Sequence, residues 1–181
     1  DTRIQVRCGA SSFSLPAMPV EEYPQVPRVD SVSGSVPADV FAEAIAQVSL
    51  AASKDDVTPV ITGVQFEIAD NALTLTATDR YRVATRRIDW QPLGGDPTLT
   101  ALVPAKVVIE VGKMFGGDGT VEVAIVKDSD RELVAFTGGN KTVTSLLIKG
   151  NYPPVGRLFP ETIENYAVLN TAELVEAVGA E

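Results

Sequence analysis

Val36-Pro37-Ala38-Asp39-Val40 opens one helix-like stretch, which reaches Val48, and Val103-Pro104-Ala105-Lys106-Val107 opens a second, which reaches Phe115. The two openings lie 67 residues apart in the chain. Apolar residues recur at helical spacing in both stretches, so each helix is predicted to bury one face. The same half of a structural unit therefore occurs twice in the sequence.

Each predicted helix begins with a proline and carries a polar face. Pro37 and Pro104 are expected in the first helical turn, where a missing N–H has no partner in any case. The polar faces hold six side chains: Asp39, Glu43, Gln47, Lys106, Glu110 and Lys113. These faces are expected to meet solvent or something solvated.

After each helix the apolar period changes from 3.6 to 2, which is typical of half-buried strands. The strands predicted in the first half are residues 64–68, 73–77 and 81–85. Those predicted in the second half are residues 121–125, 133–136 and 143–148, with turns at 128–130 and 138–140. With a strand ahead of each helix (31–36 and 99–103), each half becomes β-α-β-β-β. The predicted fold class is α+β, with two helices beside two antiparallel sheets.

A longer repeat runs across the whole chain. Residues 23–29 resemble residues 152–158 at a step of 129, and residues 36–45 resemble residues 169–178 at a step of 133. Pro, Gly and polar residues at 19–30 and 150–162 are typical of linkers. We therefore predict the terminal hairpin and linker of a preceding module at 1–30, one complete module at 31–150, and the linker, first strand and first helix of a following module at 151–181.

Composition limits the function classes. The 181 residues are 45% hydrophobic and 22% charged, which is typical of a globular chain with a core, and no apolar run is long enough to cross a membrane. The net charge of −9 argues against nonspecific adhesion to nucleic acid. Cys8 is the single cysteine, so no internal disulfide forms, and it is predicted to be a small buried strand residue in a reducing compartment.

The residues of most catalytic sites are missing. The chain has no histidine, which excludes His-assisted nucleophiles and His-containing metal sites. It has no phosphate-binding loop, and residues 116–119 (GGDG) are interpreted as a helix stop. The carboxylate pairs at 55–56 and 128/130 fall in predicted turns, where an Asp side chain typically forms hydrogen bonds with the nearby backbone. We predict no catalytic residue, no metal and no cofactor.

Residues 78–87 (TDRYRVATRR) hold four arginines in a chain that is acidic elsewhere. Strand alternation would place Arg80, Arg82 and Arg86 on one face, with Tyr81, Val83 and Thr85 on the other. Two interpretations stay open. The face protects a sheet edge from pairing, or it orients a peptide or acidic partner beside apolar walls, with help from the linker residues Arg157 and Leu158.

Three segments carry a resemblance to a known family. Gly63 to Glu67 read GVQFE, Leu73 to Ala84 read LTLTATDRYRVA, and Tyr152 to Pro160 read YPPVGRLFP. They are similar to three motifs of the bacterial DNA polymerase III beta subunit, the sliding clamp: the G-x-x-F-E strand, the T-D-x-[HY]-R-[LV] motif and the interdomain F/Y-P-x-x-x-x-[LVI]-x-P segment. With the helix and strand order, the resemblance covers nearly all 181 residues.

The resemblance implies a DNA-clamp fold, in which a protomer has three like domains of two β-α-β-β-β halves each. Two protomers join head to tail as a homodimeric ring around duplex DNA. The chain would then contain the end of domain one at 1–30, the middle domain at 31–150 and the start of domain three at 151–181. Such a protein is a cytoplasmic, nucleoid-associated processivity factor of DNA replication that contacts no membrane.

The resemblance also implies a mechanical function without catalysis. Clamps tether the replicative polymerase, clamp-loader subunits, repair polymerases and ligase through short peptide motifs. Carried over by motif, the peptide pocket would be formed by Ile61, Thr78, Arg80, Tyr81, Arg82, Val83, Pro153, Arg157 and Leu158. The DNA-facing residues would be Lys54, Lys106 and Lys113.

One residue departs from the family pattern, since many members have a small residue where Arg80 stands. A long arginine there is expected to narrow the pocket mouth or to add a salt bridge to a partner carboxylate. The alternative function is an unrelated repeat scaffold that binds an acidic ligand or peptide through the arginine-rich strand face, and an enzyme is a third alternative. The clamp interpretation alone requires both helices to lie side by side on one face of the module.

Overall fold

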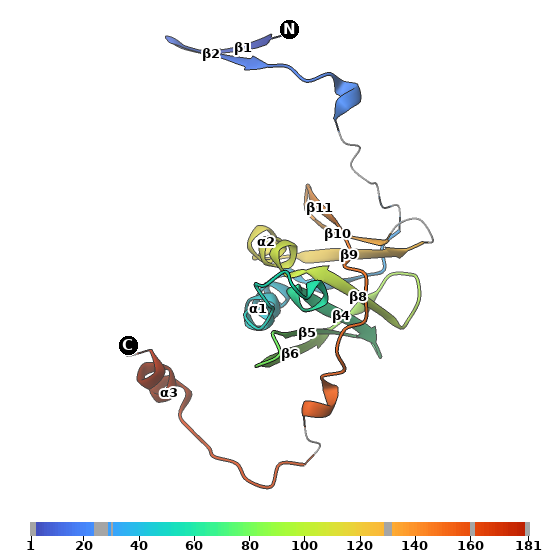
Figure 1. The fold of residues 1–181 in the computed structure, drawn as a ribbon, viewed down its shortest axis with the longest axis vertical. Helices are drawn as coiled ribbons and strands as arrows, with labels where there is room; N and C mark the ends of the chain where they lie inside the picture. Colours follow the sequence, from blue (N-terminus) through green and yellow to red (C-terminus); the bar gives the residue numbers. More distant parts are fainter. Residues whose placement is uncertain (1–2, 24–28, 30, 129–131, 160–161, 180–181) are drawn as a thin grey trace. The chain divides into compact units, whose positions relative to one another are not determined.

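Residues 3–23, 29, 31–128, 132–159 and 162–179 are described in the computed structural model, shown in Figure 1. The chain divides into two units, residues 1–150 and residues 151–181. Among the described residues, the first unit contains the two predicted helices and all of the strands, and the second contains one short α-helix.

The two predicted helices are present as α1 (Ala38–Ser49) and α2 (Ala105–Phe115). Pro37 and Pro104 stand at the N-cap positions, one residue before the expected first turn, and each also ends a strand. A proline fits at the N-cap for the same reason as in the first turn, because no helical hydrogen bond needs its N–H. Gly116 is the C-cap of α2, which confirms residues 116–119 as a helix stop.

Nine strands of the first unit form two antiparallel sheets, which confirms the predicted α+β class. The five-stranded sheet has the order β11 (Lys141–Leu146), β10 (Glu132–Gly138), β9 (Thr120–Lys127), β3 (Gly34–Pro37) and β7 (Gln91–Pro92). The four-stranded sheet has the order β6 (Val83–Asp89), β5 (Ala72–Thr78), β4 (Gly63–Ala69) and β8 (Leu99–Pro104).

The two halves exchange their first strands. β3 precedes α1 in the chain but pairs with β9 of the second half, where Val36 lies opposite Val121. β8 precedes α2 but pairs with β4 of the first half, where Val103 lies opposite Val64. All four valines are almost fully buried, so each sheet is held by core residues from both halves. The halves therefore form one module and not two separable ones.

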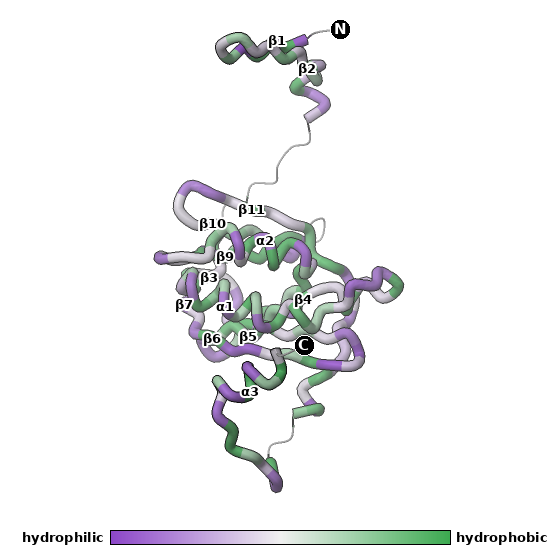
Figure 2. Tube along the Cα trace, turned by 90° about the vertical axis from the view of Figure 1, so that its left-hand side faces the viewer, coloured by the Kyte–Doolittle hydropathy of each residue, from purple (hydrophilic) through white to green (hydrophobic). Residues whose placement is uncertain are grey.

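Both helices lie side by side against the sheets (Figures 1 and 2). Gly112 of α2 allows this close approach, because a Cβ there would lie 3.1 Å from Cγ2 of Ile45 on α1. Three buried phenylalanines join a helix to both sheets: Phe41 of α1, Phe66 of β4 and Phe136 of β10, with ring centroids 6.0 to 6.2 Å apart. Burial of these rings helps to attach α1 to both sheets.

Several predicted strand boundaries are wrong, and β3, for example, begins at Gly34 and not at residue 31. The third strand begins at Val83 and not at Tyr81, because Thr78 pairs with Val83 and leaves residues 79–82 to connect β5 and β6. β11 ends at Leu146, and Ile148 N–H donates to Leu102 C=O (2.8 Å) on the other sheet. The turn at 138–140 is present between β10 and β11, whereas residues 129 and 130 of the predicted turn at 128–130 lie outside the described residues.

The predicted arginine-rich strand face does not exist. Arg80 and Arg82 lie in the connection before β6, and Arg80 has a left-handed backbone with φ of 79°. Of the three arginines, Arg86 alone is on the strand, where it is paired with Leu75 at the edge of the sheet. Alternation fails here because the 79–82 turn delays the start of β6 to Val83, two residues later than the pattern indicated. The alternative scaffold function loses the surface on which it depended.

The N-terminal hairpin is formed by β1 (Arg3–Cys8) and β2 (Ser11–Pro16), as predicted. Every residue of both strands is exposed, so the prediction that Cys8 is buried is wrong. A strand position implies burial only where another layer covers the sheet. A short 3₁₀ turn follows at Val20–Glu22, and residues 24–28 and 30 of the predicted linker lie outside the described residues.

The second unit contains a 3₁₀ turn, η3 (Gly156–Leu158), and the helix α3 (Thr171–Val178). Asn170 caps α3, because its Oδ1 accepts hydrogen bonds from the backbone N–H groups of Ala172 (2.9 Å) and Glu173 (3.3 Å). The first strand predicted within residues 151–181 is not found among the described residues of that range. In the first unit the corresponding strand, β3, is paired with β9 of the opposite half.

Candidate functional site

The 79–82 turn, which joins β5 to β6, is held by several side-chain hydrogen bonds. Thr78, which is buried, organises its base: its Oγ1 donates to Arg82 C=O (2.7 Å) and accepts from Arg80 N–H (3.2 Å). Asp79 N–H also donates to Arg82 C=O, at 3.4 Å. The hydroxyl of Thr78 therefore works inside the turn, and its methyl group alone is left for other contacts.

The carboxylate of Asp79 holds the top of the turn. Oδ1 accepts hydrogen bonds from Tyr81 N–H (3.1 Å) and Arg82 N–H (3.0 Å), and Oδ2 pairs with Arg82 Nε at 3.1 Å. Desolvation raises the pKa of this carboxyl, but the two backbone N–H groups and the Arg82 guanidinium together outweigh it. The pKa of Asp79 therefore lies below its ordinary value of 3.8.

This arrangement predicts acid sensitivity of the turn. Because the folded pKa is depressed, the stabilisation by Asp79 is present above the ordinary value of 3.8 and is lost as the pH falls through the lower folded value. In NMR titrations the amide signals of Tyr81 and Arg82 are expected to shift together, with a midpoint below 3.8. Asp79→Asn keeps the accepting oxygen and is expected to abolish this titration. A midpoint above 3.8 in the unmodified chain would contradict the assignment.

Arg80 connects the turn to a second segment. Its Nη2 donates to Oγ1 of Thr58, the residue that precedes the 3₁₀ turn η2 (Pro59–Thr62). Ile61 of η2 is buried, and its C=O accepts a hydrogen bond from Ser53 N–H (2.9 Å), which fixes η2 to the loop after α1. The arginine therefore bridges two loops that are 22 residues apart in sequence.

The apolar part of this site consists of two side chains, one of them almost fully exposed. Tyr81 is 97% exposed at the tip of the turn, and Val83, the first residue of β6, is half-buried. Exposed tyrosines are common anchors in protein interfaces because a large ring is offered at low conformational entropy cost. The structure thus brings together Thr78, Arg80, Tyr81, Arg82 and Val83 in one turn, with Ile61 in the segment to which Arg80 is bonded.

The other predicted pocket residues belong to the second unit. Pro153 is half-buried, and Arg157 and Leu158 are exposed on η3. Leu158 is 61% exposed, so an apolar side chain is available there. A pocket shared by these residues and the 79–82 turn is a proposal, taken up below.

Sequence reasoning missed two residues of the site. Asp79 was assigned no role of its own from the sequence, although Asp is favoured in turns because its carboxylate can accept hydrogen bonds from nearby backbone N–H groups. Thr58 gave no signal, because its role depends on a contact across 22 residues. Both act by positioning Arg80 and Arg82.

The three predicted DNA-facing lysines are all exposed, with Lys54 in the loop after α1 and Lys106 and Lys113 on α2. Lys113 Nζ pairs with Glu110 Oε1 at 2.8 Å. α1 carries two carboxylates and no cation, whereas α2 carries two lysines and one glutamate. The two helices together have a net charge of −1, which is too weak and of the wrong sign to bind phosphates tightly.

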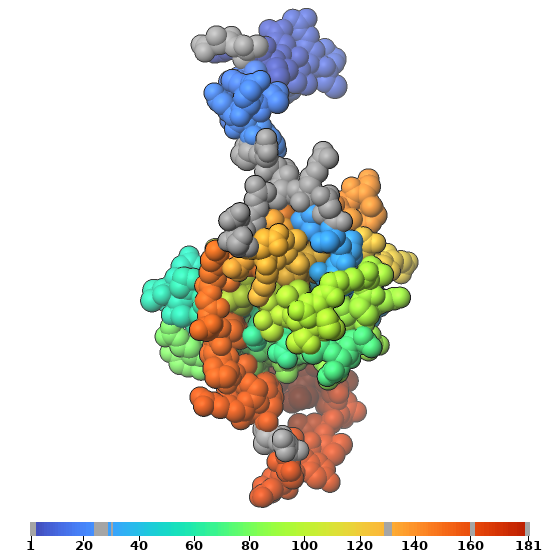
Figure 3. All heavy atoms as spheres, turned by 90° about the vertical axis from the view of Figure 1, so that its right-hand side faces the viewer, coloured from blue at the N-terminus to red at the C-terminus, as the bar shows by residue number. Residues whose placement is uncertain are grey.

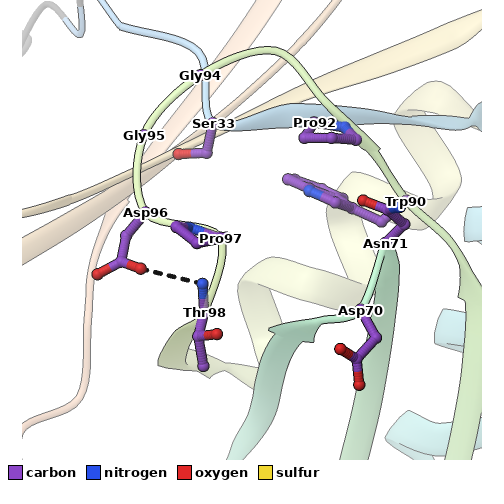
Figure 4. A pocket seen from close by; sticks show the side chains of 10 residues that line it. All are labelled: Ser33, Asp70, Asn71, Trp90, Pro92, Gly94, Gly95, Asp96, Pro97 and Thr98. Carbon is purple, nitrogen blue, oxygen red and sulfur yellow. Dashed lines mark hydrogen bonds between the residues drawn. The ribbon is translucent and has the colours of Figure 1, made fainter.

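A pocket of about 300 Å³ lies elsewhere on the first unit, beside the exposed segment 91–98 that joins the halves (Figures 3 and 4). The ring of Trp90 lies on Gly34, where a Cβ would come within 2.2 Å of the indole. Asp96 Oδ1 accepts from Thr98 N–H at 3.0 Å, so this carboxylate is used within the loop. None of the predicted site residues lines this pocket.

The part of the chain that the structure describes contains no cluster of three or more Cys, Asp or Glu side chains placed to hold a metal ion. Within the same residues, no helix has both the length and the apolar character that a membrane crossing requires. The candidate site combines a cation, an aromatic ring and a rigid turn, which are features of surfaces that make noncovalent contacts.

Comparison with known proteins assigns the fold to a family. Residues 35–154 match the family model of the DNA polymerase III beta subunit, central domain. The beta sliding clamp of Micrococcus luteus is 42% identical over 175 residues, covering 97% of this chain and 56% of that protein. The chain belongs to the DNA polymerase III beta subunit family. This membership agrees with the paired helices and rules out an unrelated scaffold.

Solved structures of the family share the arrangement. The DNA polymerase sliding clamp of Bacillus subtilis has a TM-score of 0.87 at 27% identity, covering 98% of this chain and 46% of that one. The sliding clamp of Pseudomonas aeruginosa bound to griselimycin has a TM-score of 0.78 at 26% identity, covering 91% of this chain and 44% of that one. The chain spans about half the length of the family members it matches.

Proposed function

We propose that the full-length protein is a processivity factor of DNA replication, a sliding clamp whose ring encircles duplex DNA. The observation that carries this proposal is the module itself: two helices side by side, backed by two antiparallel sheets, in a chain of the beta subunit family. In this proposal residues 1–30 end domain one, residues 31–150 form the middle domain and residues 151–181 begin domain three. Two protomers join head to tail, in the cytoplasm and at the nucleoid.

The proposed hold on DNA is topological and not adhesive. The exposed sides of α1 and α2 carry charges of both signs, and one of the two lysines of α2 is already paired with Glu110. Such a surface tolerates DNA nearby without arresting it, because each tight phosphate contact would have to be broken at every step of sliding. Lys54, Lys106 and Lys113 would supply weak, salt-sensitive attraction.

The proposed chemistry is peptide capture, with no catalysed reaction. The 79–82 turn presents Tyr81 and two arginines from the first unit, and Pro153, Arg157 and Leu158 would form the neighbouring wall from the second. Aromatic and arginine side chains are the residue types that dominate binding energy in interfaces. The proposed occupants are short motifs of the replicative polymerase, clamp-loader subunits, repair polymerases and ligase.

Removing two of these side chains tests the pocket. Tyr81→Ala with Arg157→Ala is expected to weaken binding of a polymerase-tail peptide to the full-length protein by roughly 30-fold or more, since hot-spot truncations cost about 2 kcal/mol or more. Isothermal titration calorimetry measures the affinity. Both residues are exposed, so the fold is expected to be unchanged.

The matched control replaces an exposed tyrosine and an exposed arginine outside the site, Tyr23→Ala with Arg7→Ala, and is expected to bind like the unmodified protein. Equal affinities for the pocket variant and the unmodified protein would show that the peptide binds elsewhere. The clamp function would then need a different attachment point for its partners.

A further inference from the structure

We propose that Arg80 reads an acidic side chain in the partner peptide, so that the site prefers motifs with Asp or Glu beside the apolar anchor. This inference rests on the proposed function and specifies the chemistry of the peptide. It concerns Arg80, for which the sequence left open a narrowed pocket mouth or a salt bridge to a partner carboxylate. The structural basis is the way in which the charges of the 79–82 turn are distributed.

The neighbouring carboxylate cannot neutralise Arg80. Both oxygens of Asp79 are engaged, with Oδ1 accepting from two backbone N–H groups and Oδ2 paired with Arg82 Nε. Its negative charge is thus matched by Arg82, which is the guanidinium closest to it. Asp79 and Arg82 form a neutral pair within the turn, and the positive charge of Arg80 remains.

Arg80 itself contacts a neutral group. Its side chain donates to the hydroxyl of Thr58, and the two ion pairs found among the described residues are Arg82 with Asp79 and Lys113 with Glu110. A guanidinium has five N–H donors, and Thr58 engages one nitrogen. The remaining donors can meet a carboxylate in a two-pronged contact, which is stronger and more directional than the bond to a hydroxyl.

The guanidinium is also held in place before any peptide arrives. The left-handed backbone at Arg80, with φ of 79°, is supported by the bond from its N–H to Thr78 Oγ1, and the bond to Thr58 fixes the far end. Ordering a free arginine would reduce the affinity of any complex it joined. Because the side chain of Arg80 is already ordered in the free protein, less conformational entropy is lost on binding, and the contact with a peptide carboxylate contributes more to affinity.

The acidic residues nearest in sequence to Thr58 do not form an ion pair with Arg80, so Arg80 remains available to a peptide carboxylate. Asp55 and Asp56 are exposed on the preceding loop, and Asp55 Oδ1 accepts from Val57 N–H at 3.0 Å. Neither is ion-paired with Arg80 in the described structure. They would repel a peptide carboxylate placed on their own side, so the preferred acidic position should be a single one, next to the tip of the turn.

The test uses the full-length protein and fluorescent peptides derived from its own polymerase tail. At each position flanking the apolar anchor, one peptide carries Asp and its partner carries Asn, which has the same shape without the charge. At one position the Asp peptide is expected to bind about 5-fold tighter in fluorescence anisotropy, with the ratio falling as salt is raised. In Arg80→Gln the Asp and Asn peptides are expected to bind equally.

Two further variants separate charge from positioning. Thr58→Val removes the hydroxyl but keeps the size of the side chain, and it is expected to reduce the Asp preference without abolishing it. Arg87→Gln removes an exposed arginine from β6 and is expected to leave the full preference. A preference that survives in Arg80→Gln, or that is absent from the unmodified protein, would overturn the inference.

The same data distinguish this inference from the proposed function. If the unmodified protein binds the Asp and Asn peptides equally, and binds both more weakly after Tyr81→Ala, then the peptide pocket stands and the role of Arg80 falls. If no tail peptide binds at all, the pocket and the role of Arg80 fall together.

Discussion

Cutting the circle is expected to release the protein from DNA. The full-length protein, loaded on circular DNA by a clamp loader, should remain bound through a salt wash and then dissociate almost completely after a restriction enzyme linearises the circle. The charge of the helix layer supports this expectation: α1 and α2 together carry a net charge of −1, which offers phosphates no net attraction. In the proposed ring, retention would come from encirclement of the DNA.

Gel filtration of the DNA complex before and after cutting measures the retained fraction. The control is linear DNA whose two ends are blocked by bulky protein, from which release should again be prevented. Protein that stays on open linear DNA, or that leaves the intact circle in salt, would show adhesive binding and contradict the ring.

Replacing Phe136 by Ala is expected to lower the free energy of unfolding of the first unit by about 3–5 kcal/mol. Phe136 is fully buried on β10, and its ring centroid lies 6.0 Å from that of Phe41 and 6.1 Å from that of Phe66. The truncation leaves a cavity where α1 meets both sheets, so the loss includes contacts on three elements. Urea unfolding followed by the fluorescence of Trp90, the single tryptophan and a buried one, measures it.

The matched control is Phe13→Ala, the same chemical change at a residue of β2 that is 60% exposed. It is expected to change the free energy of unfolding by less than about 0.5 kcal/mol. Similar losses in the two variants would mean that the aromatic cluster does not hold the helix layer to the sheets.

Much of the fold could be predicted from local pattern. The 3.6-residue period between Val40 and Val48, and again between Val107 and Phe115, predicted both helices to within two residues. The period of two located the strands, and the repeat of the VPA segment predicted two similar halves. These signals are local, because each depends on which residues of one element face the core.

The candidate site was predicted in part. The TDRYRV motif pointed by resemblance to residues that the structure gathers at one turn, but strand alternation placed them wrongly, on a flat face and not in a turn. The motif said nothing of Thr58, since the Arg80 contact joins two loops that are distant in sequence. Cys8 shows the same limit: its strand was predicted and its burial was not, because burial depends on what covers the hairpin.

The sequence by itself determined the elements, their duplication and the family. The tertiary structure alone decided that β3 and β8 exchange between the halves. It also decided that Asp79 is ion-paired with Arg82 within the turn, whereas Arg80 is bonded to a neutral hydroxyl. The physical reason is that apolar periodicity records burial along one element, whereas strand pairing and charge pairing depend on partners from distant parts of the chain.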